Sequence, residues 1–275
     1  MNLFNDRLKQ AFKNRSVLKV ITGIENTKIS QIVKIAEASK LAGVTYLDVS
    51  ANVKIVKALK SSYDLPVCVS SINPVDIYNC VVSGADIVEI GNYDVFYREG
   101  IYITVEQIIG LFKEVKSLIP NIDICVTIPY FLTCTEQINL TKSLDLLGVN
   151  IIQTEGMSNV KYIKPNTNKC NKDLVCLPNS FIPSLFSTNI LSNITKVPIL
   201  ASSGFKNINS PITKLYGASG VGISSALKQY DSISDIVKYI IQTTGSLNIT
   251  DSIQSIDTPE TQNDSKLRSY PLIKR

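Results

Sequence analysis

Short apolar segments recur along the chain, and they are of two alternating kinds. Four begin with glycine followed by alanine or valine: GVTYLDVS from Gly43, GADIVEIG from Gly84, GVNIIQTEG from Gly148 and GASGVGIS from Gly217. The others follow polar residues or contain an early proline: SVLKVITG from Ser16, LPVCVSS from Leu65, NIDICVTIP from Asn121 and KVPILASSG from Lys196. Because they are short, continuous and rich in isoleucine and valine, they predict parallel strands buried on both faces.

Helix signals lie in the gaps between these strands. SQIVKIAEASKLAG, from Ser30, carries apolar residues at helical spacing. The other signals share a polar or proline opening, and they are Asn73-Pro74, Thr104 with Gln107, Thr133 with Glu136, Ser210-Pro211, residues 184–194 and residues 234–245. Eight strand–helix units in succession predict a single-domain (β/α)₈ TIM barrel, with an open doubly wound sheet as the main alternative.

The two ends of the chain differ from the repeating part. Residues 1–15 place Leu3, Phe4, Leu8, Ala11 and Phe12 on one helical stripe, which predicts an N-terminal capping helix. Residues 16–245 are then the barrel, and the polar residues 246–275 are expected to be a flexible tail. The connection 157–196 is the longest, and it reads either as a lid or as a packed surface excursion.

Composition narrows the function classes. The net charge of +5 suits an anionic small molecule, and without a compact lysine and arginine cluster it argues against nucleic acid. No apolar run approaches the roughly 18 residues of a membrane span. Histidine is absent, so catalysis would need Asp, Glu, Lys, Tyr, Cys or Ser. The six cysteines form no CxxC pair, so no metal site is expected, and Cys68 and Cys125 read as small apolar residues.

Polar residues interrupt the strands at equivalent positions. The fifth residue after the first glycine is Asp48, Glu89, Gln153 and Gly222 in the four glycine-led strands. Alternation sends this position to one face, which in a barrel is the interior near the mouth. Other polar residues expected at the mouth are Ser70, Asn73, Thr127 and Glu155.

Lys19 lies inside the first apolar strand, where an ammonium group needs a carboxylate partner. Asp48 on the next strand is the first choice and Glu89 the second. One interpretation is a structural ion pair that fills the barrel. The other is a catalytic set in which Lys19 is an electrostatic stabiliser, general acid or Schiff-base nucleophile and Asp48 or Glu89 is the base.

The last two strands predict a phosphate site. Glycine lets a phosphate approach the backbone closely, and unpaired amides at the start of a short helix favour a dianion. The expected ligands follow strands seven and eight, and they are Ser203 and Gly204 together with Gly222, Ile223, Ser224 and Ser225. Lys206 would add a nearby charge. The alternative is that these glycines only ease the packing of helix on strand.

Several segments carry a resemblance to known proteins. The last two strands resemble the phosphate-binding quarter of tryptophan- and histidine-pathway enzymes, thiamine-phosphate and thiazole synthases and FMN-dependent oxidoreductases. LKVITGIEN, PVCVSSINP, GADIVEIGNYDVFY, VTIPY, IIQTEG and LASSG resemble the hypothetical chloroplast reading frame family, number twenty-three, over residues 3–245. This family of algal plastids and cyanobacteria is a domain of unknown function with an aldolase-type barrel. The resemblance implies a plastid-encoded stromal protein without a transit peptide, and no catalytic assignment.

The function expected from these observations is binding of a phosphorylated metabolite or FMN, without nucleic acid or membrane partners. Such a barrel could act as an isomerase, lyase or aldolase through Lys19, Asp48 and Glu89. The alternative is a non-catalytic regulatory protein that senses a phosphometabolite or FMN. The sequence leaves open whether there is a reaction, which substrate is bound and whether the chain forms homo-oligomers.

Overall fold

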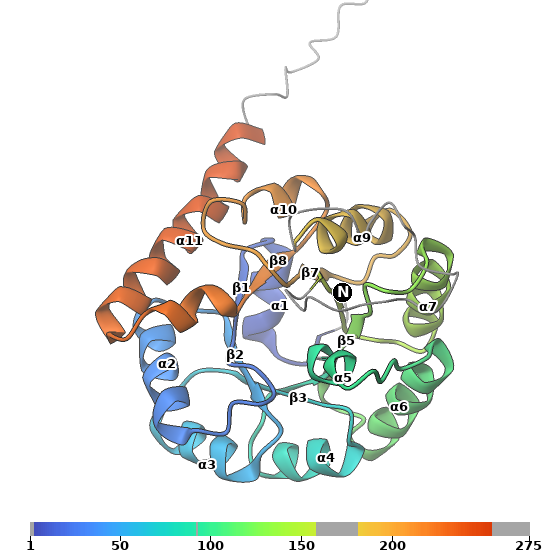
Figure 1. Cartoon of the computed structure of the whole chain (residues 1–275), viewed down its shortest axis with the longest axis horizontal. Coiled ribbons are helices and arrows are strands. Elements are labelled where there is room, and N and C mark those ends of the chain that lie inside the picture. Colours follow the sequence, from blue (N-terminus) through green and yellow to red (C-terminus); the bar gives the residue numbers. More distant parts are fainter. Residues whose placement is uncertain (1–2, 92, 158–180, 255–275) are drawn as a thin grey trace, which may run out of the picture.

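The fold is a closed barrel of eight parallel strands, and the computed structural model describes residues 3–91, 93–157 and 181–254 of it. The strands pair in sequence order and β8 pairs with β1, which closes the barrel and excludes the open sheet (Figure 1). Their bounds are β1 Val17–Ile21, β2 Tyr46–Ser50, β3 Val67–Ser71, β4 Ile87–Ile90, β5 Asp123–Ile128, β6 Ile151–Thr154, β7 Ile199–Ala201 and β8 Gly220–Ile223. The TIM-barrel prediction is therefore confirmed.

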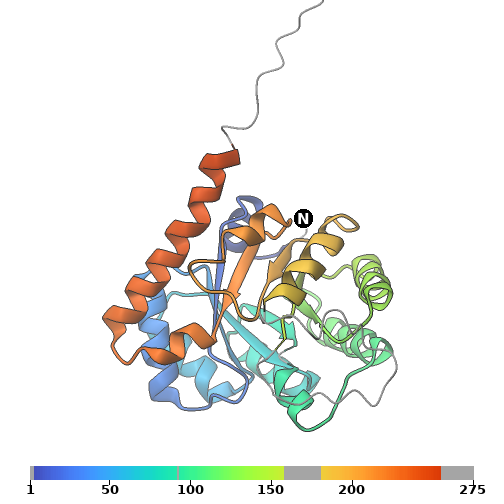
Figure 2. The ribbon, with the colours of Figure 1, turned by 45° about the horizontal axis from the view of Figure 1, so that its top comes forward.

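Helices surround the barrel in the described part of the chain (Figures 1 and 2). They are α1 Asp6–Lys13, α2 Ile29–Leu41, α3 Val53–Ser62, α4 Pro74–Val82, α5 Asp94–Arg98, α6 Val105–Leu118, α7 Cys134–Leu146, α9 Ile182–Ser192, α10 Ile212–Leu215, the 3₁₀ helix η1 Ser225–Gln229 and α11 Ile233–Gln254. The Thr104 and Thr133 capping boxes form as predicted, and the Asn73 side chain caps α4. The structure describes no helix with the length and apolarity that a membrane crossing needs.

The main core lies between the strands and the surrounding helices, as the apolar strands predict. A second cluster fills the lower barrel interior, at the end where the strands begin. It joins residues of the N-terminal segment to inward-facing strand residues: Leu3, Leu8, Phe12, Val17, Tyr46, Cys68, Ile87, Cys125, Ile151 and Leu200. The capping helix α1 therefore closes the bottom of the barrel. Phe4 does not take part as the helical stripe predicted, because its side chain is 56% exposed.

The C-terminal helix extends further than the sequence suggested. Gly245 was expected to end it, but α11 continues to Gln254 and projects beyond the barrel (Figure 1). A mid-helix glycine costs only about 1 kcal/mol relative to alanine, which burial of Leu247 can offset. The predicted tail therefore begins inside a helix. Residues 255–275 and most of the 157–196 connection, with Cys170 and Cys176, lie outside the described residues.

Asp123 anchors the N-terminal segment beneath the barrel. Its carboxylate accepts hydrogen bonds from the amides of Phe4 at 2.9 Å and Asn5 at 3.0 Å. Replacing Asp123 with alanine is expected to lower the free energy of unfolding by about 1–3 kcal/mol, because two amides lose their acceptor. Trypsin should then cleave faster at Lys9 and Lys13. Asp64→Ala, at an exposed position, is the control, and equal cleavage rates in the two variants would contradict this role.

Candidate functional site

A buried polar layer crosses the barrel immediately above the apolar cluster. Six consecutive strands each contribute one side chain to it: Lys19, Asp48, Ser70, Glu89, Thr127 and Gln153. Each stands two residues after an inward-facing residue of the lower cluster, so strand alternation places all six inside the barrel. The position predicted from the glycine-led strands is thereby shown to face the barrel interior.

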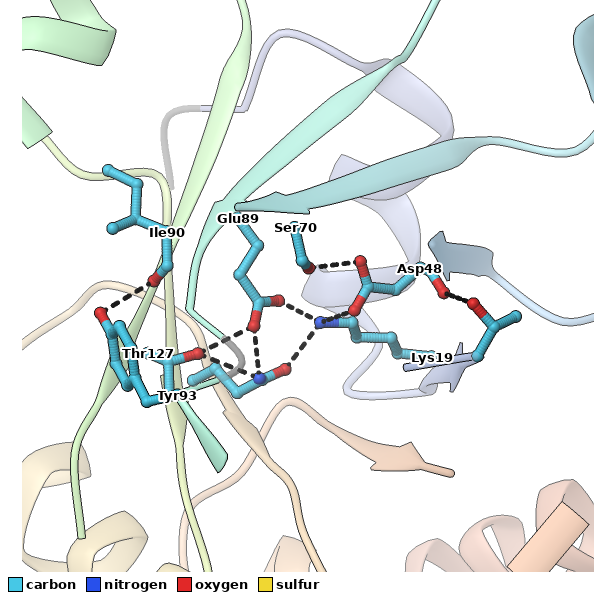
Figure 3. A network of polar contacts seen from close by, with 9 residues as sticks. Lys19, Asp48, Ser70, Glu89, Ile90, Tyr93 and Thr127 are labelled. Atoms are coloured by element: carbon cyan, nitrogen blue, oxygen red, sulfur yellow. Dashed lines mark hydrogen bonds and ion pairs between the residues drawn. The ribbon is translucent and has the colours of Figure 1, made fainter. Parts of the chain in front are cut away.

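Lys19 is the centre of this layer (Figure 3). Its Nζ is paired with Glu89 Oε2, lies 3.2 Å from Asp48 Oδ2 and donates to Gln153 Oε1 at 2.9 Å. The structure thus gives Lys19 both predicted carboxylate partners. The remaining oxygens are also satisfied, since Ser70 Oγ donates to Asp48 Oδ1 at 2.5 Å.

Glu89 is held on its other side by two neutral donors. Its Oε1 accepts from Thr127 Oγ1 and from Gln153 Nε2, both at 2.8 Å. Burial raises the pKa of Glu89, and the nearby Lys19 charge opposes this rise. Burial by itself lowers the pKa of Lys19, but the charges of Asp48 and Glu89 outweigh it and keep that pKa well above its ordinary value. Lys19 is therefore an ammonium group at neutral pH.

Gly91 makes room for this network. A Cβ at Gly91 would lie 2.4 Å from Thr127 Oγ1 and 2.6 Å from Glu89 Oε1. We expect Gly91→Ala to lower the free energy of unfolding by about 1–3 kcal/mol through overpacking, as measured by urea denaturation. Gly110→Ala is the matched control, because a Cβ there meets nothing within 4 Å. A Gly91→Ala variant as stable as wild type would show that the network tolerates displacement.

Two residues of this layer and one of the apolar cluster below it carry atoms that metals bind. Asp48, Cys68 and Glu89 bring a carboxylate, a thiol and a second carboxylate within 4.8 Å of one another. Burial raises the pKa of the Cys68 thiol well above its ordinary value, so it is not a thiolate. Both carboxylates already pair with Lys19, which supplies the positive charge that a metal would bring. This donor set therefore fits the lysine better than a metal ion.

An open cavity of about 740 Å³ lies at the end of the barrel where the strands finish. It is displaced towards β7, β8 and β1, and residues from the loops after these strands form most of its wall. Lys19, Asp48 and Glu89 do not line it. Ile21, two residues after Lys19, and Ser202 belong to the wall nearest the polar layer. The predicted catalytic set is therefore buried beneath the cavity rather than exposed in it.

Four predicted phosphate ligands line this cavity from two loops: Ser203 and Gly204 after β7, and Ser224 and Ser225 after β8. Within the described residues, their four amides donate no hydrogen bond to protein atoms. Ser203 and Gly204 have φ angles of 71° and 77°. A left-handed conformation costs a non-glycine residue roughly 1–2 kcal/mol, and such strain gathers at binding sites.

The other predicted ligands lie elsewhere. Gly222 and Ile223 fall inside β8 and pair with Lys19 and Val20 of β1, so the expectation that they follow the strand is wrong. Gly222 instead provides space, because a Cβ there would lie 2.8 Å from Ser202 Oγ. The short helix that follows is only the five-residue η1, so its dipole adds little to anion binding. Asn73 is exposed and occupied as the α4 cap.

Glu155, which the sequence analysis expects at the mouth, directly follows β6 and is buried, in an environment that the sequence did not indicate. Its Oε2 accepts from the Tyr97 hydroxyl at 2.7 Å and from the Tyr130 amide at 3.3 Å. Burial raises the pKa of Glu155 well above its ordinary value, and the Asp94 charge adds to the rise. Tyr97 packs against Tyr102, Tyr130 and Phe131. The sequence showed the aromatic residues of the GNYDVFYREG loop but no pattern linked them to Glu155.

Comparison with known proteins identifies the family. A family model described as "Protein of unknown function (DUF561)" matches residues 3–253. The chain belongs to this family. It is 43% identical over 244 residues to the uncharacterized protein ycf23 of Antithamnion sp., with 87% of each chain covered. It is 36% identical over 251 residues to ycf23 of Porphyra purpurea, covering 91% of this chain and 92% of that protein. The family resemblance of the sequence is confirmed, and these names suggest a plastid origin.

Solved structures of low sequence identity share the barrel. Thiamine phosphate pyrophosphorylase from Pyrococcus furiosus is 17% identical, with a TM-score of 0.56 and coverage of 90% of this chain and 99% of that one. (S)-3-O-geranylgeranylglyceryl phosphate synthase from Thermoplasma acidophilum, in complex with sn-glycerol-1-phosphate, is 12% identical, with a TM-score of 0.59 and coverage of 90% and 98%. At these identities the likeness concerns the fold.

Proposed function

We propose that this protein binds a phosphorylated small molecule in the cavity at the ends of β7, β8 and β1, in the plastid stroma. The phosphate is held by the amides of Ser203, Gly204, Ser224 and Ser225. The observation that carries the proposal is that these four residues line one cavity from two loops and that their amides have no acceptor within the described protein. Ser203, Gly204 and Ser224 are half-buried and Ser225 is exposed. Half-buried amides need partners, and oxyanions are strong acceptors for them.

The cavity wall carries three acidic residues, Glu25, Asp94 and Asp231, beside three basic ones, so an anionic ligand would depend on a base that is not already paired. Lys28, Lys34 and Arg98 belong to its wall. Arg98 is paired with Glu25 at 2.6 Å and Lys34 donates to the backbone oxygen of Asp231. No ion pair is recorded for Lys28 within the described residues. Lys206, which the sequence suggested as a phosphate partner, is exposed and is not part of the wall. Lys28 is therefore the better candidate for the nearby charge.

The fold neighbours are compatible with this function without establishing it. The Thermoplasma synthase barrel was solved with sn-glycerol-1-phosphate, a phosphate monoester. The proposal for this chain depends instead on its own unpaired amides. Conventional barrels place ligands at the same end of the strands, where loops can vary without disturbing the core.

Catalysis through Lys19, Asp48 and Glu89 is the second candidate function, as an isomerase or lyase. The observation in its favour is the position of this set directly beneath the cavity wall at Ile21. Schiff-base chemistry of the aldolase type needs a neutral amine, and the raised pKa of Lys19 opposes it. Lys19 would act as a fixed positive charge or general acid. A regulatory protein that binds the same ligand without turnover needs only the cavity.

Calorimetric titration tests the binding proposal. Wild-type protein should bind glycerol 3-phosphate and not glycerol. Gly204→Ala should weaken binding about tenfold or more, because its φ of 77° resists a side chain and any relaxation moves the amide. Gly43→Ala is the matched control, since Gly43 has a φ of 72° and lies outside the cavity wall. Equal weakening in both variants, or equal binding of glycerol, would overturn the proposal.

A further inference from the structure

The cavity is larger than a phosphate group and a short carbon chain require. Its volume is about 740 Å³, the size of sites that enclose drug-sized ligands. Liquid water would fill it with about 25 molecules at roughly 30 Å³ each. A triose phosphate of about ten heavy atoms leaves most of such a space empty, whereas a mononucleotide of about 25–30 fills it.

Part of the cavity wall beyond the proposed phosphate ligands is apolar. It is formed where the loop after β1 and helix α2 face η1 and the start of α11, and it includes Ile24, Ile35, Leu227 and Ile236. Leu227 and Ile236 are buried and Ile24 and Ile35 are half-buried. Apolar surface is therefore offered mainly by Ile24 and Ile35. A fully hydrophilic sugar phosphate gains nothing from this surface, while a ring system gains the free energy of burying its faces.

Tyr230 adds an aromatic ring to the same wall. It directly follows η1, and its ring packs 5.4 Å from the ring of Tyr239. Tyr239 is in turn buried and accepts a hydrogen bond from the Asn207 amide. Tyr230 is therefore a supported ring at the edge of a cavity, and such a ring can stack on a planar ligand at little entropic cost.

The distance between the proposed phosphate site at Ser224 and the Tyr230 ring matches the length of a single ligand. The 3₁₀ helix η1 separates Ser224 from Tyr230, and its five residues span about 10 Å at roughly 2 Å per residue. A phosphate at Ser224 and a ring at Tyr230 thus stand about one ribose or ribityl chain apart. Gln31 and Lys34 of α2 also belong to the wall and provide donors for the heteroatoms of a ring.

We propose that the ligand is a phosphate monoester that carries an aromatic ring, of the mononucleotide class, with its phosphate at the two loops and its ring against Tyr230 and the apolar residues of the same wall. This inference rests on the proposed phosphate site. The cavity volume, the apolar residues of its wall and the Tyr230 ring narrow the class of ligand. None of these three features is needed for binding the phosphate itself.

Titration of the full chain with four probes tests this inference. FMN and AMP should each bind at least tenfold more tightly than glycerol 3-phosphate, and riboflavin should bind more weakly than FMN. Tyr230→Ala should weaken FMN or AMP about tenfold and leave glycerol 3-phosphate unchanged. Tyr230→Phe should retain the ring advantage. Tyr78→Ala, at an exposed tyrosine on α4 outside the cavity, is the control.

The outcomes separate this inference from the proposed phosphate site. Equal affinity for glycerol 3-phosphate, FMN and AMP would overturn the aromatic class and leave the phosphate site standing. An equal effect of Tyr230→Ala on all three would also overturn it, because the residue would then act on the loops rather than on a ring. No binding of any phosphate monoester would overturn both proposals.

Discussion

Replacing Lys19 with methionine is expected to lower the free energy of unfolding by about 3–5 kcal/mol, the usual cost of leaving a buried charge without its partner. Lys19 is fully buried and faces two buried carboxylates, Asp48 and Glu89. Methionine preserves the volume of the side chain and removes only the charge and its hydrogen bonds. Urea denaturation followed by circular dichroism measures the change.

The stability lost in Lys19→Met should depend on pH. Burial raises the pKa of Glu89 and Lys19 opposes that rise, so removing Lys19 raises the pKa further. An acid whose pKa is higher in the folded state destabilises the fold as pH rises above its unfolded value, about 4.3 for glutamate. The deficit of Lys19→Met should therefore shrink as pH falls towards 4 and grow towards neutrality. A deficit independent of pH would contradict a charge-based origin.

Two further variants separate charge from packing. Adding Glu89→Gln to Lys19→Met removes one uncompensated carboxylate and should recover part of the lost stability. Lys60→Met is the control, because Lys60 pairs with Asp86 at 2.9 Å while both side chains remain partly exposed. Half-exposed pairs contribute about 1 kcal/mol or less. If Lys60→Met were as costly as Lys19→Met, the polar layer would have no special role.

Ser224→Asp is expected to abolish phosphate binding while the protein remains folded. Ser224 precedes η1, a position where aspartate is as acceptable as serine. A carboxylate about 5 Å from a bound phosphate opposes it by roughly 3 kcal/mol at an effective dielectric constant of about 20, or more than 100-fold in affinity. Calorimetric titration with glycerol 3-phosphate measures this loss.

The uncharged variant Ser224→Asn is the control for the size of the new side chain. Ser224→Asn is close in size to Ser224→Asp and lacks the charge, so it should change affinity by less than tenfold. Thermal denaturation of both variants should match wild type within a few degrees. If asparagine and aspartate weakened binding equally, a steric effect rather than a phosphate at Ser224 would account for the loss.

The barrel could be predicted from the sequence because its signal is repeated and local. Each buried strand is a short apolar run, and each capping motif, such as Thr104 with Gln107, involves neighbours along the chain. The polar layer could also be predicted. Strand alternation places Asp48, Glu89 and Gln153 on the inner face once the barrel is assumed. The carboxylate partners of Lys19 could be predicted because an isolated charge inside an apolar strand is too costly to leave unpaired.

Other features depended on packing between distant segments. The pairing of Tyr97 with Glu155 joins residues 58 positions apart and has no local pattern. The ends of β8 and α11 were misplaced by one to several residues, since pairing with β1 extends the strand to Ile223 and burial of Leu247 helps carry the helix through Gly245. Lys19 is buried beneath the cavity and is not part of its wall, which only the arrangement of several loops decides.

The most direct test of the phosphate site is an amide chemical-shift titration of labelled protein with glycerol 3-phosphate, compared with glycerol. The account predicts that the largest shifts occur at Ser203, Gly204, Ser224 and Ser225, whose amides lack protein acceptors. Glycerol should produce none of them. Shifts concentrated on any other surface, or identical shifts with glycerol, would contradict the account.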